Sequence, residues 1–250
     1  MNTTKGSPLG TYRKNAISVG VLFIIATVLG VMGKMKFLSP ILDAPDLLIK
    51  VSNNQNQVII GSLLVLASAF ACAGIAIGLY PVLRKHNEAL ALGSVGFRVM
   101  ETMLYVIGVA CTLSLIPLSQ ESASAGPSIA SSFQISGPLL LLIKDSAGML
   151  SVITFTMGAL MYYYVFYRSK LIPRWLSGWG LVAAVSSLAC ILLTIFGQLV
   201  PFSTVFILLQ LPIGLQEMVL AVWLIAKGFN QSAIVSAAVK TVTNESLNAA

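Results

Sequence analysis

The sequence predicts an all-α polytopic membrane protein: a bundle of six transmembrane helices with both termini cytoplasmic and a short interfacial helix on the outer side. The first observation is composition, because 57% of the 250 residues are hydrophobic and only 9% are charged. A soluble domain carries about 25% charged residues. The second observation is a set of six apolar runs, each long enough to cross the hydrocarbon core as a helix. The third is the uneven distribution of lysine and arginine between the connections.

Polar connections and prolines mark the ends of the apolar runs. The expected spans are Ala16–Gly33, Val58–Tyr80, Ala89–Ile116, Pro138–Tyr167, Trp175–Val200 and Phe202–Ala226. Pro81 and Pro117 are expected to end the second and third spans. Only Pro201 separates the fifth from the sixth, which predicts a tight antiparallel hairpin. We expect residues 1–230 to form a single six-helix transmembrane domain, followed by a polar, flexible cytoplasmic tail over residues 231–250.

Two connections have features of their own. The connection from Lys34 to Gln57 contains a segment, Pro45–Val51, with an apolar face and an acid–base pair four residues apart. This pattern predicts a short helix that lies across the mouth of the bundle. The connection Gln120–Gly137 is rich in small and polar residues, so we expect a flexible loop or a mobile lid there.

Orientation follows from the basic residues, because positive charges are retained on the cytoplasmic side of a membrane. Ten of the fifteen fall in the two termini and in the second and fourth connections, against three in the first connection. Both termini are therefore expected inside the cell. The formal net charge of +7 is spread over these short connections rather than gathered into one patch, which argues against nucleic-acid binding.

The third span carries two charged residues inside an apolar run, Arg98 and Glu101. They belong to a polar stripe at alternating steps of four and three residues, which places its members on one face of a helix. Its members are Ser94, Arg98, Glu101, Tyr105, Gly108 and Thr112. A matching stripe on the sixth span consists of Gln210, Gly214, Glu217 and Ala221. Because charges at membrane depth are costly, we expect the charged members to converge in the bundle.

The candidate ligand-binding residues, or buried polar cluster, are therefore Arg98, Glu101, Tyr105, Gln210 and Glu217. Two interpretations of this cluster stay open. It can be an ion cluster that fixes helix register, or a site where one of the glutamates exchanges a proton or a cation. Lys144 and Asp145 fall near the outer end of the fourth span, where their side chains can reach water, so they are weaker candidates.

Other kinds of site find little support in the sequence. Cys72, Cys111 and Cys190 each lie in an apolar run without a C-x-x-C spacing, and His86 is the only histidine. These residues offer no metal or haem site within one chain. No catalytic signature is present, so we expect no catalytic residue, no metal and no cofactor, and the sequence argues against an enzyme.

Several segments resemble the bacterial membrane family catalogued as domain of unknown function 4386. They include Tyr80-Pro81-Val-Leu-Arg84-Lys85-His86-Asn87-Glu88, Gly96-Phe-Arg98-Val-Met-Glu101 and Gln216-Glu217-Met-Val-Leu-Ala-Val-Trp223. The similarity extends from about Tyr12 to Gly228. It implies a multi-pass protein of the bacterial inner membrane, and the family supplies no reaction or substrate to carry over.

Two functional hypotheses follow. The first is a small-molecule, lipid or ion binder or transporter built on the Arg98, Glu101 and Glu217 cluster, with a proton or cation as one possible ligand. The alternative is a non-catalytic membrane sensor or a protective or interaction subunit. Either protein has the lipid bilayer as its constant partner.

Overall fold

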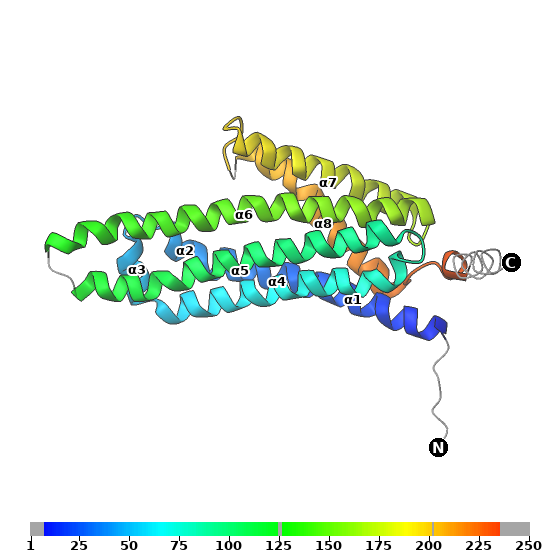
Figure 1. Ribbon diagram of the computed structural model, residues 1–250, viewed down its shortest axis with the longest axis horizontal. Coiled ribbons are helices and arrows are strands. Elements are labelled where there is room, and N and C mark those ends of the chain that lie inside the picture. The colour runs from blue at the N-terminus through cyan, green and yellow to red at the C-terminus, as the bar shows by residue number, and fades with distance from the viewer. Residues whose placement is uncertain (1–7, 125–126, 202, 236–250) are drawn as a thin grey trace, which may run out of the picture. The chain divides into compact units, whose positions relative to one another are not determined.

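The computed structural model describes residues 8–124, 127–201 and 203–235. Within these residues the chain is helical, with no strand, and six of its helices are long and apolar enough to cross a membrane. The elements are α1 (Pro8–Val31), η1 (Met32–Leu38), α2 (Ser39–Leu42), α3 (Leu47–Asn53), α4 (Gln55–Leu83), α5 (Glu88–Ser124), α6 (Pro127–Ser169), α7 (Arg174–Ile195) and α8 (Thr204–Ala226) (Figure 1). The prediction of an all-α protein with six spanning helices is confirmed.

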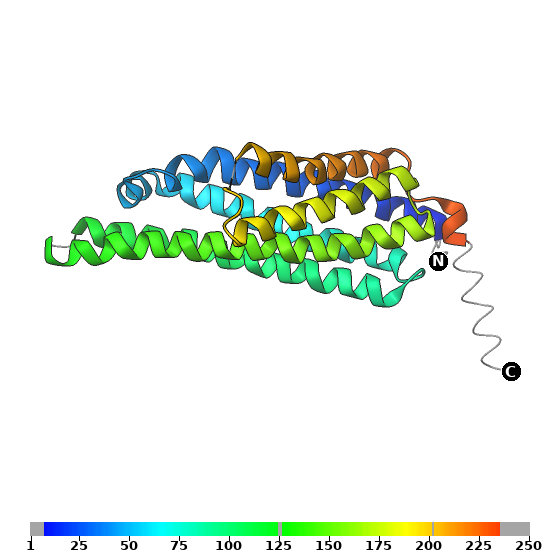
Figure 2. The same ribbon diagram turned by 90° about the horizontal axis from the view of Figure 1, so that it is seen from above.

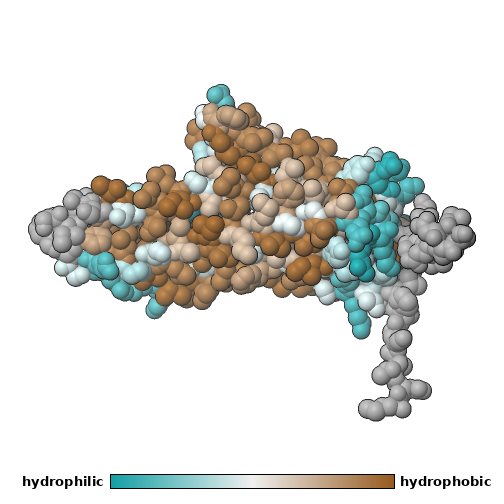
Figure 3. Space-filling model, viewed as in Figure 1, coloured by the Kyte–Doolittle hydropathy of each residue, from teal (hydrophilic) through white to brown (hydrophobic). Residues whose placement is uncertain are grey.

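Large apolar side chains are exposed along all six long helices, among them Val182 (71% exposed) and Leu208 (62% exposed). In water such a surface would drive association, whereas in a bilayer it meets lipid chains. Hydrophobic residues cover most of the face shown in Figure 3. The protein is therefore a multi-pass membrane protein in contact with the lipid bilayer.

α4 and α5 are longer than the sequence predicted, and Pro81 and Pro117 do not end them. α4 runs past Pro81 to Leu83, and α5 runs past Pro117 to Ser124. A proline removes one backbone hydrogen bond, whereas ending the helix leaves all the carbonyls of its last turn without helical partners. A continuous helix that lacks one hydrogen bond is the less costly solution, so the expectation that these two prolines end their spans was wrong.

The first span also extends beyond its expected end at Gly33. After α1 the chain continues as the π-helix η1 and then α2, and the apolar span reaches Leu42. The backbone N–H of Ser39 donates to the carbonyl of Lys34, which is the i→i+5 pattern of a π-helix. Pro40 follows directly and cannot donate a backbone hydrogen bond, so the helix changes its hydrogen-bond pattern where an α-helical ladder would be interrupted.

The expectation of a flexible loop or lid over Gln120–Gly137 was wrong for the described residues. α5 continues to Ser124 and α6 begins at Pro127, which leaves only residues 125–126 outside the description. The Nε2 atom of Gln120 donates to Oε1 of Gln55 at 3.0 Å, and the Ser124 hydroxyl lies 3.1 Å from the Gln120 carbonyl. Small and polar residues are therefore compatible with helix here because their side chains bond to nearby helical groups.

The chain divides into two compact units, and the long helices α1, α4, α5 and α6 contribute residues to both. The first unit consists of the described residues of Met1–Ile24, Ala73–Val99 and Ile153–Ala250, and the second of Ile25–Cys72 and Met100–Val152. The single domain over residues 1–230 stays a prediction. Residues 231–235 are helical, and the rest of the expected tail, residues 236–250, lies outside the described residues.

The second unit is built around an apolar core that includes the short helix α3. Leu47 and Val51 of α3 are 8% and 0% exposed and belong to the same core as Val109 and Leu115 of α5. A Cβ atom added at Gly137 of α6 would lie 3.3 Å from side-chain carbons of Leu47 and Leu48. The segment expected to form a short packed helix therefore does so, and it packs through the apolar face that the sequence predicted.

The first unit contains α7 and α8 together with one end of each of the other long helices. α7 and α8 pack against each other as an antiparallel pair, as Figures 1 and 2 show. The hydroxyl of Ser186 donates to the carbonyl of Leu209 at 3.0 Å across this pair. The turn between them spans residues 196–203 rather than Pro201 alone, so the expected hairpin is present with a longer connection.

Polar residues of the first unit are concentrated at the end where α4 turns into α5, α6 turns into α7, and α8 stops (Figure 3). Arg13 of α1 holds this end together. Its guanidinium donates to the carbonyls of Leu224, Ile225 and Ala226 at 3.1, 2.6 and 3.2 Å. These carbonyls belong to the last turn of α8 and have no partner further along that helix. We refer to this region as the basic end of the first unit.

Candidate functional site

Arg98 and Glu217 lie at matching depths in the first unit. Arg98 is ten residues into α5 from Glu88, and Glu217 is nine residues before the end of α8 at Ala226. At ~1.5 Å per residue, both lie roughly 15 Å from the basic end, which is about half the thickness of a hydrocarbon core. The Asn87 side chain caps the N-terminus of α5 at this end, because it accepts a hydrogen bond from the backbone N–H of Leu90 at 3.0 Å. The two charges are thus placed at one level by two helices that end on the same side.

The structure brings these two side chains together. Nη2 of Arg98 lies 3.7 Å from Oε1 of Glu217, and the two side chains are 2% and 16% exposed. A short charge-assisted hydrogen bond measures about 2.7–2.9 Å. The contact is therefore an ion pair without a tight hydrogen bond between these two atoms. The Glu217 side chain as a whole is more exposed than that of Arg98, although its Oε1 atom is buried.

Two residues of α6 shape the surroundings of Arg98. The guanidinium carbon lies 4.8 Å from the centre of the Phe155 ring, which is a cation–π distance. A Cβ atom added at Gly158 would lie 3.3 Å from the Ser94 carbonyl and 3.4 Å from Cγ of Arg98. The missing side chain at Gly158 thus lets α6 approach α5 closely, so Arg98 lies between an aromatic ring and a carboxylate.

A second polar group lies beside Glu217. The Tyr163 hydroxyl of α6 donates to Oε1 of Gln216, and Nε2 of Gln216 donates to the Leu176 carbonyl of α7 at 3.1 Å. Gln216 and Tyr163 are both fully buried. This network joins three helices and fixes the turn of α8 that carries Glu217.

Gln216, Tyr163 and Phe155 are not among the candidate residues predicted from the sequence. Gln216 falls outside the four-three spacing of the α8 stripe, and Tyr163 lies in an aromatic run typical of a membrane interface. A signal was nevertheless present, because a glutamine next to Glu217 in an apolar helix needs hydrogen-bond partners at that depth.

Gln210 lies on the expected face of α8 but takes a different partner. Its Oε1 accepts a hydrogen bond from the Ser187 hydroxyl of α7 at 2.6 Å. It lies seven residues before Glu217, roughly 10 Å away along the helix axis. Gln210 therefore joins α8 to α7 away from the Arg98–Glu217 pair.

Glu101 and Tyr105 belong to the second unit, although α5 carries both of them and Arg98. Glu101 is buried at 3% exposure. The Tyr105 ring lies 4.6 Å from the ammonium of Lys34 in a cation–π contact. Their convergence with Arg98 and Glu217 stays a prediction.

The weaker candidates form a surface pair. Nζ of Lys144 lies 2.6 Å from Oδ1 of Asp145, and the side chains are 28% and 57% exposed. Over the described ranges, no group of three or more histidine, cysteine, aspartate or glutamate side chains is placed to hold a metal ion. The site of the first unit thus consists of an ion pair, an aromatic ring and an amide network.

The chain was compared with curated proteins, solved structures and protein-family models. No curated protein and no solved structure matches the chain. A family model described as Domain of unknown function (DUF4386) matches residues 18–228, which include all six spanning helices in whole or in large part and the Arg98–Glu217 pair. The chain therefore belongs to the DUF4386 family of membrane proteins.

Proposed function

We propose that the protein binds a small molecule, a lipid or an ion around Arg98 and Glu217, and that Glu217 is the group that exchanges a proton or a cationic ligand. The observation that carries this proposal is the asymmetry of the pair: Arg98 is 2% exposed, Glu217 is 16% exposed, and 3.7 Å separates their charged atoms. A ligand that competes with Arg98 for this carboxylate oxygen replaces a contact that is longer than a charge-assisted hydrogen bond.

The energetics of buried ion pairs support this proposal. Taking two charges out of water costs several kcal/mol per ion, and a pair with imperfect geometry recovers only part of that cost. Stability alone is therefore a weak reason for charges at this depth. Ionisable groups inside membrane spans are more often found where a proton, an ion or a substrate binds.

The helix that carries Glu217 has a weak point close by. Pro212 lies inside α8, five residues before Glu217, and cannot donate a hydrogen bond to the Leu208 carbonyl. Interrupted helices provide binding groups at membrane depth in many transporters. Bending of α8 at Pro212 would change the distance between Glu217 and Arg98, which couples ligand binding to a movement.

Flux measurements test transport through this site. The full chain, Glu217→Gln and Asp145→Asn are reconstituted into vesicles that contain a pH-sensitive dye, and an imposed pH gradient drives proton movement. We expect proton flux with the unchanged protein and with Asp145→Asn, whose carboxylate is exposed, and loss of flux with Glu217→Gln. Flux that survives Glu217→Gln would contradict the proposal.

Thermal unfolding in detergent tests binding without transport. Sodium, potassium and tetramethylammonium chloride are compared at equal ionic strength. We expect at least one cation to stabilise the unchanged protein and Asp145→Asn but not Glu217→Gln. Identical responses of all three proteins to every cation, together with equal flux, would leave the pair with a structural role only.

An interaction subunit is the second candidate function. It is favoured by the concentration of polar and charged residues at the basic end of the first unit (Figure 3). In that case the loops contact another protein, and a partner should co-purify at a fixed stoichiometry from the native membrane. We place the protein in the bacterial inner membrane in both cases, with both termini in the cytoplasm, on the distribution of lysine and arginine.

A further inference from the structure

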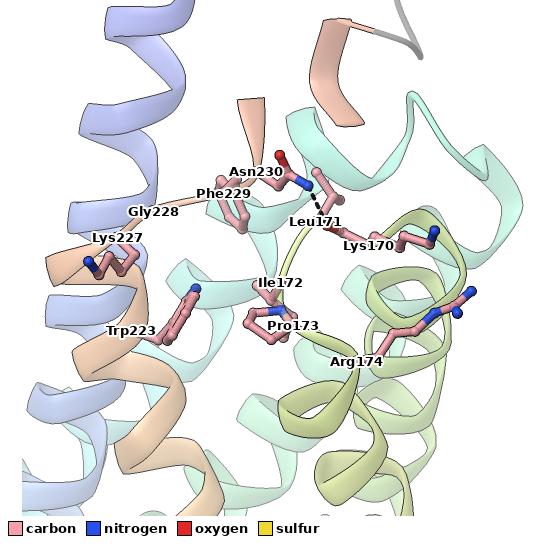
Figure 4. Close-up of a pocket in the computed structure, with 10 residues that line it drawn as sticks. All are labelled: Lys170, Leu171, Ile172, Pro173, Arg174, Trp223, Lys227, Gly228, Phe229 and Asn230. Atoms are coloured by element: carbon pink, nitrogen blue, oxygen red, sulfur yellow. Dashed lines mark hydrogen bonds between the residues drawn. The ribbon is translucent and has the colours of Figure 1, made fainter. Parts of the chain in front are cut away.

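A pocket of about 540 Å³ opens at the basic end of the first unit, remote from the Arg98–Glu217 pair. Its walls come from the connection between α6 and α7, from the last turn of α8 and from the residues that follow α8. The lining residues include Lys170, Ile172, Pro173, Arg174, Trp223 and Lys227 (Figure 4).

The walls of the pocket are fixed by contacts between these segments. The chain reverses after α8 at Gly228, whose φ of +73° favours glycine. Asn230 then binds the opposite wall: its backbone N–H donates to the Leu171 carbonyl at 2.8 Å, and its Nδ2 donates to the Lys170 carbonyl at 3.2 Å. Phe229 is 6% exposed, and its ring centre lies 6.1 Å from that of Phe166. The pocket therefore exists before a ligand arrives.

The pocket has a positive rim and an apolar floor. Lys227 lies on one side in Figure 4 and Lys170 and Arg174 lie on the other, with the charged ends of all three side chains turned outward, and Ile172, Pro173 and Trp223 lie between them. The three basic side chains are exposed, so they are free to turn towards an anion above the apolar floor. None of the ten lining residues carries a carboxylate. Such a pocket fits an anion that has an apolar portion attached to it.

The end of a helix such as α8 would ordinarily oppose an anion, because its last carbonyls carry partial negative charge. Here the Arg13 guanidinium binds those carbonyls at 2.6–3.2 Å. The first turn of α7, which begins at Arg174, adds the partial positive charge of a helix N-terminus. The net field at the pocket therefore favours negative charge.

The position of the pocket relative to the bilayer indicates where the anion comes from. The spans of α6, α7 and α8 end at Ser169, Arg174 and Ala226, so the pocket lies at the level where lipid headgroups begin. The rings of Trp175 and Trp223 meet edge to face, 6.5 Å apart, and Trp175 is 56% exposed. Exposed tryptophan is typical of this interface, and the positive-inside rule places it in the cytoplasmic leaflet, which is rich in anionic lipid.

We infer that this pocket binds the phosphate of an anionic phospholipid from the cytoplasmic leaflet, with Lys170, Arg174 and Lys227 around the phosphate and Trp223 against the glycerol and upper acyl region. The inference is independent of the function proposed for Arg98 and Glu217. A phospholipid headgroup and free phosphate carry the same kind of negative charge. The apolar floor of the pocket favours the lipid over free phosphate.

The test uses the full chain in detergent and follows tryptophan fluorescence, since Trp223 lines the pocket. Three probes are titrated: short-chain phosphatidylglycerol, short-chain phosphatidylcholine and inorganic phosphate. We expect saturable binding of phosphatidylglycerol and much weaker binding of the other two. If phosphatidylcholine binds as tightly as phosphatidylglycerol, the pocket does not recognise the negative charge. If inorganic phosphate binds as tightly as phosphatidylglycerol, the pocket does not recognise the glycerol and acyl portion. Either result overturns the inference.

A matched pair of double variants locates the site. The pocket variant is Lys170→Asn with Lys227→Gln; asparagine is chosen because Lys170 has a φ of 58°, which asparagine tolerates. The control is Arg84→Gln with Lys85→Gln, which removes the same charge from the turn between α4 and α5 at the basic end. Each lysine near a membrane surface contributes a factor of about five, so the pocket variant should bind phosphatidylglycerol about 25-fold more weakly.

The affinity of the control double variant for phosphatidylglycerol should fall by less than a factor of about five, because this variant changes only the electrostatic field around the pocket and not the pocket itself. Equal losses in the two double variants would place the effect outside the pocket and overturn the inference. Size-exclusion profiles and melting temperatures of both variants establish that they are folded. If the pocket variant does not fold, Lys227→Gln alone is used, with Lys85→Gln as its control and the same two outcomes.

Discussion

Nη2 of Arg98 on α5 and Oε1 of Glu217 on α8 lie 3.7 Å apart, although 118 positions separate the two residues in the chain. The pair joins a helix from the middle of the sequence to the last spanning helix. Any movement of α8 relative to this part of α5 therefore changes an electrostatic interaction within the first unit.

The first prediction concerns the unequal cost of removing each partner. Arg98→Ala leaves a carboxylate without this partner inside the membrane and should destabilise the protein by about 3–5 kcal/mol. Glu217→Gln keeps the shape and an oxygen acceptor, so it should cost about 1 kcal/mol or less. Thermal unfolding of both variants in detergent measures the difference. Equal losses would indicate a purely structural pair.

The second prediction concerns the contact between α7 and α6 at Gly180. A Cβ atom there would lie 2.5–2.7 Å from ring atoms of Tyr163, which is buried and bonded to Gln216. Gly180→Ala should therefore destabilise by about 1–3 kcal/mol through overpacking. Gly178→Ala is the control on the same helix, because its Cβ would lie 3.8 Å from Tyr167, an ordinary contact. Similar melting temperatures for the two variants would contradict this description of the interface.

The third prediction concerns α3 in the second unit. Leu47 is 8% exposed within the apolar core, whereas Ile49 on the same helix is 62% exposed. Leu47→Ala should cost about 2–4 kcal/mol of stability, and Ile49→Ala should cost less than about 1 kcal/mol. Thermal unfolding distinguishes them. A larger loss at Ile49 would mean that α3 packs through its other face.

The fourth prediction concerns orientation in the membrane. In a chain whose three cysteines are replaced, a single cysteine at Ser122 should react with an impermeant thiol reagent added outside intact cells. A cysteine at Lys85 should react only after the membrane is opened. These outcomes follow from the excess of lysine and arginine on one side. The reverse labelling pattern would invert the topology and place the phosphate-binding pocket on the outer face.

The sequence allowed the helices to be counted and placed because hydropathy reports directly on what a bilayer accepts. The pairing of Arg98 with Glu217 was also foreseeable, since both residues lie a similar distance from the same end of their helices. The ends of the helices were harder to predict from the sequence. Pro117 and the polar residues after Gln120 are typical of helix ends, but a proline removes only one backbone hydrogen bond and the Ser124 hydroxyl bonds to a carbonyl of its own helix, so α5 continues.

The hydrogen-bond network of the Gln216 side chain could not be predicted from the spacing of residues along α8. It depends on Tyr163 and on the Leu176 carbonyl, which come from two other helices. A stripe on one helix shows which residues share a face, but the partner of a side chain depends on which helices become neighbours. The pocket at the basic end likewise depends on the fold of residues 228–230 against the turn after α6, and no periodicity encodes that contact.

The contact of Arg13 with Leu224, Ile225 and Ala226 has a consequence for biosynthesis. Arg13 is near the start of the chain, and its three acceptors are more than 200 residues further on. α1 enters the membrane before those carbonyls have been synthesised. The hydrogen bonds of Arg13 therefore form only after α8 has been inserted. The contact joins two parts of the chain that are synthesised at different times, and a chain that stops short of Leu224 lacks all three acceptors of Arg13.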